Sequence, residues 1–295
     1  MTLEENLLEI RLNGFSILQG IIPNSEVAGV RDSVVNAQAR HDAKSKADLN
    51  AIRSRGHRIG VKGVGNMLQV INETQAFAPY LANSQILDIA EAFFGPWSRI
   101  SSTSCVINYP GNERGYWHAD WPYNQTNSSH IRAPYPDTLL HLATIWMLSD
   151  FTEEKGGTIL LPGSHRMDQN PSVRAVLERD RTDIDGSADP LPGFETDSPY
   201  PTEVQATGKA GSVLLYDSRL WHAVAPNQSD HPRVAILVRY APWWLNLNPT
   251  MKGRPEHEMM VVERETKNYE NPPIDRRVYE SLPEEVKPLY RHFVG

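Results

Sequence analysis

Short segments with alternating polar and apolar residues, between Ile100 and Ala241, constrain the fold more than any other feature of the sequence. A period of two residues is typical of β-strands, because successive side chains point to opposite faces of a sheet. Turn residues separate the segments, and no crossover helix lies between them. The pattern predicts an antiparallel sandwich, barrel or jelly roll. The segments are ISSTSCVINY, LLHLATIWML, GGTILLP, GSVLLYD and RVAILVRYA.

The residues before this block follow a helical pattern. In residues 1–97, two segments carry apolar residues at helical spacing on one face, PNSEVAGVRDSVVNAQAR and NSQILDIAEAFFGP. Residues 43–66, between them, are basic and glycine-spaced. We expect this stretch to be a loop with weak strand character.

We expect one domain over residues 1–295, with a mostly β core at 98–245 and flanking helices. Residues 167–203 are rich in Asp, Pro and Gly and form a long insertion between two strands. Insertions of this length in compact domains are usually functional or disordered, so a lid over the site is one hypothesis for this segment. The tail, 246–295, is charged and proline-punctuated, with one short helix expected in PEEVKPLYRHF.

Composition limits the functional classes. A net charge of −7 gives no basic surface for nucleic acid. The hydrophobic fraction is 40%, and no apolar run is long enough for a membrane span. The N-terminus is acidic and amphipathic, without the pattern of a signal peptide, which points to the cytoplasm. Cys105 is the single cysteine, so an internal disulfide or a cysteine-built zinc site is excluded, and we expect a buried, inert thiol.

The segment RGYWHADWPYN places His118 two residues before Asp120. On a strand, these two side chains share one face and can reach one metal ion. The pair by itself is equally compatible with an ordinary polar strand end. His222, between a hydrophobic strand and a proline-rich turn, offers a third ligand. Two histidines and one carboxylate form a facial triad, which leaves three positions of an octahedral iron(II) open.

Arg233 opens the next strand, eleven residues after His222. Alternation in RVAILVRY puts Arg233, Ala235, Leu237 and Arg239 on one face of that strand. Arg233 can therefore point inward, where a guanidinium would bind a dicarboxylate cosubstrate through two parallel hydrogen bonds.

Three stretches resemble the signatures of the phytanoyl-CoA dioxygenase family of iron(II)- and 2-oxoglutarate-dependent oxygenases. They are WHADW, TIWMLSDFTEEKGGTILLPGSHR and LWHAVAPNQSDHPR. In that family, a strand with a tryptophan, an acidic turn, a glycine and PGSH occur in this order between the two halves of the metal site. The similarity spans roughly residues 98–244. A looser likeness in NGFSILQGIIPNSEV resembles the family's opening strand and helix.

The resemblance implies a double-stranded β-helix, or jelly roll, with the metal in its mouth. His118 and Asp120 would be the proximal iron ligands and His222 the distal ligand. Arg233 would hold the distal carboxylate of 2-oxoglutarate. The implied reaction uses dioxygen, converts 2-oxoglutarate to succinate and carbon dioxide, and hydroxylates a C–H bond of a small-molecule substrate.

Further residues match cosubstrate positions in relatives. Asn108 resembles a polar strand residue directed at the cosubstrate, although a satisfied strand amide is an equal alternative. Trp146 stands where relatives pack an aromatic beside the cosubstrate, and a core tryptophan is the alternative. Relatives often have Ser or Thr two residues after the distal histidine, where this chain has Val224. Thr158 or Tyr109 would have to compensate.

Other histidines and aromatics have simpler interpretations. His141 alternates with apolar neighbours, which favours a satisfied core histidine, and His165 in PGSHR is expected to fix a turn. The aromatics near the ligands either fill the core or form a dry wall around the site. They are Trp117, Trp121, Tyr123 and Trp221.

Two questions stay open at the level of sequence. Asp120 favours hydroxylation, because related halogenases replace this carboxylate by a small residue, but desaturation and cyclisation remain alternatives. A different class is a non-catalytic or other-metal cupin-like binding protein. Arg233 together with three complete ligands favours the enzyme. The sequence does not identify the substrate or the oligomeric state.

Overall fold

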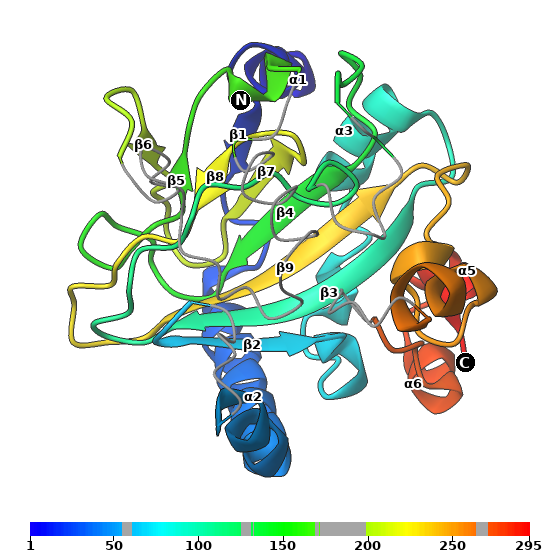
Figure 1. The fold of residues 1–295 in the computed structure, drawn as a ribbon. Coiled ribbons are helices and arrows are strands. Elements are labelled where there is room, and N and C mark those ends of the chain that lie inside the picture. The colour runs from blue at the N-terminus through cyan, green and yellow to red at the C-terminus, as the bar shows by residue number, and fades with distance from the viewer. Residues whose placement is uncertain (55–60, 125–130, 132, 169–170, 172–198, 264–270) are drawn as a thin grey trace.

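The computed structural model describes residues 1–54, 61–124, 131, 133–168, 171, 199–263 and 271–295 (Figure 1). Most of the insertion predicted at 167–203 therefore lies outside the described residues, and so does the lid hypothesis. Among the described residues, no helix is both long and apolar enough to cross a membrane.

Two antiparallel sheets form the centre of the molecule. In the main sheet, the strand order is β1-β7-β4-β9-β3-β2, and the small sheet has the order β6-β5-β8. The pairing confirms the predicted mostly β, jelly-roll class. The main strands are β1 (Phe15–Leu18), β2 (Val64–Leu68), β3 (Arg99–Asn108), β4 (Leu142–Met147), β7 (Val213–Asp217) and β9 (Arg233–Ala241). The small strands are β5 (Ile159–Leu160), β6 (Val204–Gln205) and β8 (His222–Ala223).

Three helices cover the outer face of the main sheet (Figure 1): α1 (Leu3–Asn13), α2 (Asn24–Ser54) and α3 (Ser84–Phe94). Apolar residues of α2 at helical spacing lie in the same buried cluster as residues of β3, β7 and β9. The two predicted helices are thus confirmed. The loop expected from residue 43 was wrong, because α2 continues to Ser54. Residues 43–54 contain no Gly or Pro and include good helix formers, and this propensity outweighs their charge.

The C-terminal part packs against the main sheet beside β3 (Figure 1). Gln69 donates a hydrogen bond to the Pro272 carbonyl, and Asn72 donates one to the Pro273 carbonyl. The expected short helix is present as α7 (Lys287–Tyr290). The remaining elements here are α5 (Pro255–His257), α6 (Arg276–Ser281) and a π-helical turn, Glu258–Val262. 3-10 turns occupy Val70–Asn72, Ala78–Tyr80, Ser164–Arg166, Asn248–Thr250 and Arg291–Phe293.

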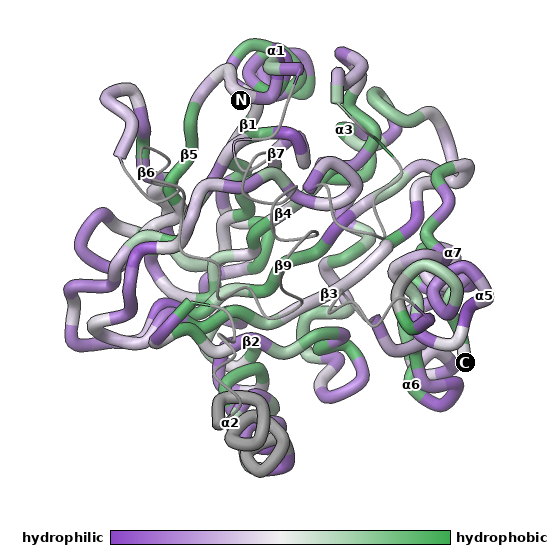
Figure 2. The backbone as a smooth tube through the Cα atoms, in the orientation of Figure 1, coloured by the Kyte–Doolittle hydropathy of each residue, from purple (hydrophilic) through white to green (hydrophobic). Residues whose placement is uncertain are grey.

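Alternation along the strands separates two buried layers. Even-numbered β4 residues such as Trp146 face the helices, and odd-numbered ones such as Ile145 face the small sheet. In Figure 2, hydrophobic colouring runs along β4, β7 and β9 in the middle of the sheet. We call the layer that faces the small sheet the inner face. It includes Ala143, Ile145, Met147, Leu214, Tyr216 and Ala235, with Leu160 from the small sheet.

Candidate active site

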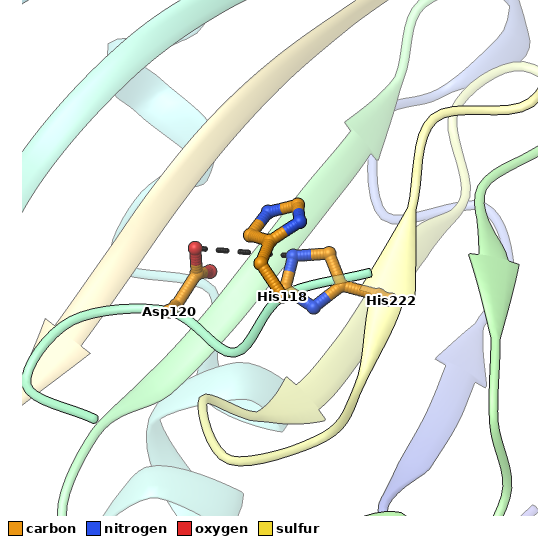
Figure 3. A group of neighbouring side chains, drawn as sticks. All are labelled: His118, Asp120 and His222. Carbon is orange, nitrogen blue, oxygen red and sulfur yellow. Dashed lines mark ion pairs between the residues drawn. The ribbon is translucent and has the colours of Figure 1, made fainter. Parts of the chain in front are cut away.

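His118, Asp120 and His222 lie together between the two sheets (Figure 3). One ligand atom from each lies within 4.8 Å of the others. His118 and His222 exchange two backbone hydrogen bonds of 3.1 and 3.0 Å, and their ring centroids are 4.1 Å apart. The expected strand at His118 is only this single bridge. The segment is otherwise irregular, with the Asp120 amide bonded to the Ser218 carbonyl.

Both histidines are oriented by backbone carbonyls two residues earlier in the chain. Nδ1 of His118 is 3.0 Å from the Tyr116 oxygen, and Nδ1 of His222 is 2.8 Å from the Leu220 oxygen. These contacts leave Nε2 of each ring for a metal. Burial, together with the neighbouring His118, lowers the pKa of His222 to about 4. His222 is thus neutral at physiological pH, which is the form that binds metal.

Asp120 is held by two side chains that the sequence did not single out. Arg239 donates to both carboxylate oxygens, at 3.0 Å from Nη2 to Oδ1 and 3.4 Å from Nε to Oδ2. The Tyr216 hydroxyl donates to Oδ2 at 2.9 Å, and Oδ1 is 3.8 Å from Nε2 of His222. Burial alone would raise the pKa of Asp120, but Arg239 and the two histidines hold it well below its usual range. Oδ1 therefore faces the histidines as a charged ligand.

Arg233 is a buried cation with no counter-ion among the described residues. Its side chain is 3% exposed, and its guanidinium lies 4.4 Å from the centre of the Phe151 ring. Within the described residues it makes no hydrogen bond or ion pair, and its Nε is buried without an acceptor. Burial lowers the pKa of Arg233 to about 9, so it stays charged at neutral pH. A buried unpaired charge is costly, so an anionic ligand would fit here.

Asn108 lies directly across from Arg233 in the β3–β9 pair. Opposite residues of an antiparallel pair share a face, so both lie on the inner face. The Asn108 side-chain amide donates a 3.4 Å hydrogen bond to the Ala225 carbonyl, while its Oδ1 is buried and has no hydrogen-bond partner among the described residues. Half of the amide is satisfied locally and half is available.

Two predicted cosubstrate residues lie elsewhere. Trp146 belongs to the helix-facing layer, and its indole N–H donates to the Thr144 hydroxyl at 2.8 Å. Its prediction as a cosubstrate contact was wrong, because alternation along β4 turns it away from the triad. Tyr109 was also wrong as a compensating hydroxyl, since it follows Asn108 on the opposite face and is 39% exposed.

Thr158 lies beside the small sheet near His222. It immediately precedes β5, in which Leu160 pairs with His222. Residues two apart on a strand share a face, so this register puts the buried Thr158 on the His222 side. Its backbone oxygen accepts a hydrogen bond from Ala206.

His141, His165 and two of the aromatics lie as the simpler interpretations expect. The rings of His141 and His165 are buried, and both nitrogens of His141 are hydrogen-bonded, to Ser101 at 2.8 Å and Ser218 at 2.9 Å. His165 contacts the Arg11 carbonyl from the turn after β5. Two of the aromatics fill a core cluster on the far face of the small sheet, with Ile159 and Ala223. They are Trp117 and Trp221.

The donor set fits a divalent iron. Two imidazoles and one carboxylate supply three ligands and leave open positions for a bidentate cosubstrate and dioxygen. The uncompensated Arg233 fits the second carboxylate of such a cosubstrate. Sequence reasoning missed Arg239 and Tyr216, and the available signal was the shared strand face of Arg233 and Arg239.

Comparisons with known proteins agree with this geometry. Residues 10–235 match the phytanoyl-CoA dioxygenase (PhyH) family. An ectoine dioxygenase of Bordetella parapertussis is 28% identical over 266 residues, which is 83% of this chain and 78% of that protein.

Solved structures show the same fold. The non-heme alpha ketoglutarate dependent carbocyclase SnoK from nogalamycin biosynthesis has a TM-score of 0.56 at 19% identity, covering 82% of this chain and 86% of that one. HygX from Streptomyces hygroscopicus, solved with nickel and 2-oxoglutarate bound, has a TM-score of 0.54 at 17% identity, covering 83% and 89%. With the family match, the chain belongs to the phytanoyl-CoA dioxygenase family and is an iron- and 2-oxoglutarate-dependent dioxygenase.

Proposed function

We propose that this enzyme hydroxylates an unactivated C–H bond of a small-molecule substrate, with dioxygen as oxidant and release of succinate and carbon dioxide. The observation that carries the proposal is the pairing of a His-Asp-His triad with Arg233, a buried cation for which the described part of the chain supplies no counter-ion. A non-catalytic binding module has no use for both. Retention of Asp120 supports hydroxylation, since the carboxylate leaves no ligand position for a halide.

In this proposal, His118, Asp120 and His222 hold the iron, and Arg233 binds the distal carboxylate of 2-oxoglutarate. When bound, iron(II) and 2-oxoglutarate would supply the electrons that reduce dioxygen and so activate it for the reaction. Asn108, opposite Arg233, and Thr158, beside His222, offer polar atoms to the cosubstrate.

The other residues position and protect the reacting groups. Arg239 donates to both oxygens of Asp120 and Tyr216 donates to Oδ2, and these bonds fix the carboxylate with Oδ1 toward His222. The apolar inner face, with Leu214 and Ala235, excludes water from the site. Exclusion of water strengthens electrostatic contacts and limits side reactions.

An anaerobic titration tests the enzyme function. Addition of iron(II) and 2-oxoglutarate to the purified protein should produce a pale lilac colour, a charge-transfer band that requires bidentate chelation. Admission of air with a cell extract should then form succinate and add one oxygen to a small molecule. A stoichiometric loss of two hydrogens, without oxygen gain, would instead assign desaturation or cyclisation. Absence of both colour and succinate would leave the binding-protein alternative.

Arg239 is expected to be a positioning residue for Asp120. Arg239→Gln should weaken iron(II) binding by about 10- to 100-fold, the usual loss when the partner of a metal ligand is removed. Arg239→Lys keeps the charge but loses the fork, so an intermediate affinity is expected. Anaerobic equilibrium titration measures both.

Arg219→Gln is the matched control for this prediction. Arg219 is 4% exposed and makes a forked ion pair with Asp217, at 2.8 Å from Nη2 and 3.2 Å from Nε to Oδ2. Arg219→Gln breaks a comparably buried ion pair and leaves the contacts of Asp120 intact. Equal losses of iron affinity in Arg239→Gln and Arg219→Gln would reduce the role of Arg239 to general stability.

A further inference from the structure

A small cavity of about 30 Å³ lies against the metal-ligand carboxylate Asp120. Its walls include Ser102 and Arg239 from the main sheet and Thr250 and Asn271 from the C-terminal segment. A water molecule needs at least about 10–15 Å³ measured in this way, so the cavity holds one small polar group and not a whole substrate.

The C-terminal wall of the cavity is held by its own backbone. The backbone N–H of Asn271 donates to the Thr250 carbonyl at 2.9 Å, and the backbone N–H of Lys252 donates to the backbone carbonyl of Asn271 at 3.1 Å. Met251, between them, is 1% exposed and packs with Trp121 in a buried cluster. The Asn271 side chain therefore sits on a fixed backbone.

Two side chains on the cavity wall lack hydrogen bonds. Asn271 is 3% exposed. Its side-chain carboxamide makes no hydrogen bond to any described residue, and its Oδ1 is fully buried. Ser102, 4% exposed, also makes no side-chain hydrogen bond to any described residue. Buried polar groups without partners cost free energy, so their retention beside the metal ligand points to a ligand that supplies the partners.

The ionic groups around the cavity are already balanced. Arg239 and Asp120 form the forked pair described above. Burial lowers the pKa of His141, also on the wall, to about 3, so this imidazole is neutral. Among the described residues, the charged side chains on the cavity wall are one cation and one anion paired with each other, so a charged group of a ligand would find no charge in excess, whereas a neutral hydroxyl or carboxamide both donates and accepts hydrogen bonds.

We propose that this cavity is a substrate subsite for one neutral hydrogen-bonding group, a hydroxyl or a carboxamide, and that Asn271 and Ser102 determine this specificity. Its role in the reaction rests on the proposed function, because its place beside Asp120 puts the bound group next to the iron site. Asn271 lies outside residues 10–235, the part of the chain that matches the family.

Three probes of the same shape and different charge test the subsite: acetamide, acetate and acetamidinium. Their binding to the metal-free, full-length protein is measured by ligand-observed NMR titration. Acetamide should bind saturably and more tightly than the two ions. Asn271→Leu should weaken acetamide binding by about tenfold, the effect of losing two ordinary hydrogen bonds, and Ser102→Ala should weaken it less.

Asn66→Leu, at an exposed asparagine of β2, is the control and should leave acetamide binding unchanged. Acetate can also bind at Arg233. Such binding is recognised because it is lost in Arg233→Met and persists in Asn271→Leu. The unfolding midpoint of each variant shows whether it is folded. If Asn271→Leu does not fold, Ser102→Ala still tests the subsite.

Three results would overturn the subsite: no saturable acetamide binding, acetamide binding that neither variant weakens, or an ion that binds as tightly as acetamide and is lost in Asn271→Leu. Because the titration needs no iron, a failure here is separate from a failure of the anaerobic colour test.

Discussion

His222→Ala should abolish succinate formation and weaken iron(II) binding by more than about 100-fold, while the fold is retained. The lower bound follows from comparison, since removal of a residue that only supports a ligand costs about 10- to 100-fold. The His222 ring is buried and its neutral form needs no counter-charge, so its loss leaves no buried ion behind. Anaerobic equilibrium titration with iron(II) measures the affinity.

His165→Ala is the matched control for His222→Ala. His165 is 3% exposed and His222 is 5% exposed, but His165 contacts the Arg11 carbonyl and lies outside the triad. Iron affinity should be unchanged in His165→Ala. An unchanged affinity in His222→Ala would remove His222 from the ligand set.

Asp120→Ala should combine loss of iron binding with loss of stability. The substitution leaves the Arg239 guanidinium buried without its carboxylate, and breaking a buried pair in this way costs about 3–5 kcal/mol. The double variant Asp120→Ala/Arg239→Met should recover much of the stability, because no charge is left unpaired, but none of the iron affinity. Chemical denaturation and iron titration of the two variants separate these effects. Equal instability of both would show that the cost arises from packing.

The fold was predictable because periodicity and turn chemistry are local properties. The alternation in RVAILVRYA became β9, and it correctly placed Arg233 and Arg239 on one face. The same local reasoning was wrong for residues 43–54, where charge was given more weight than helix propensity. It was also wrong for Trp146, where a resemblance in position was given more weight than the alternation that turns the side chain toward the helices.

Parts of the site could not be predicted because they depend on contacts between distant segments. His118 reaches His222 through a single backbone bridge, with no regular strand whose period could be read. Tyr216 and Arg239 are separated from Asp120 by 96 and 119 residues. A sequence shows which face a strand residue takes, but not which residue lies across that face.

Arg233→Met should weaken 2-oxoglutarate binding by about 2 to 5 kcal/mol, the usual loss on truncating one member of a buried charge pair. That loss corresponds to a factor of roughly 30 to several thousand in the dissociation constant. Arg233→Lys keeps a charge but not the fork, so it should recover only part of the affinity. Anaerobic titration with 2-oxoglutarate measures the dissociation constants of the iron-loaded wild-type protein and of both variants.

The same substitution should have the opposite effect on the free protein. Without cosubstrate, Arg233 is a buried cation that no described residue neutralises, so Arg233→Met should raise the unfolding midpoint. Arg219→Met is the matched control, because it breaks a satisfied pair with Asp217 and should lower the midpoint. Addition of 2-oxoglutarate should stabilise the iron-loaded wild-type protein by mass action and leave Arg233→Met nearly unaffected.

If Arg233→Met bound 2-oxoglutarate within about twofold of wild type, a difference of roughly 0.4 kcal/mol, another residue would have to anchor the cosubstrate. The gain in stability without loss of affinity would then mark Arg233 as a buried charge with a different ligand.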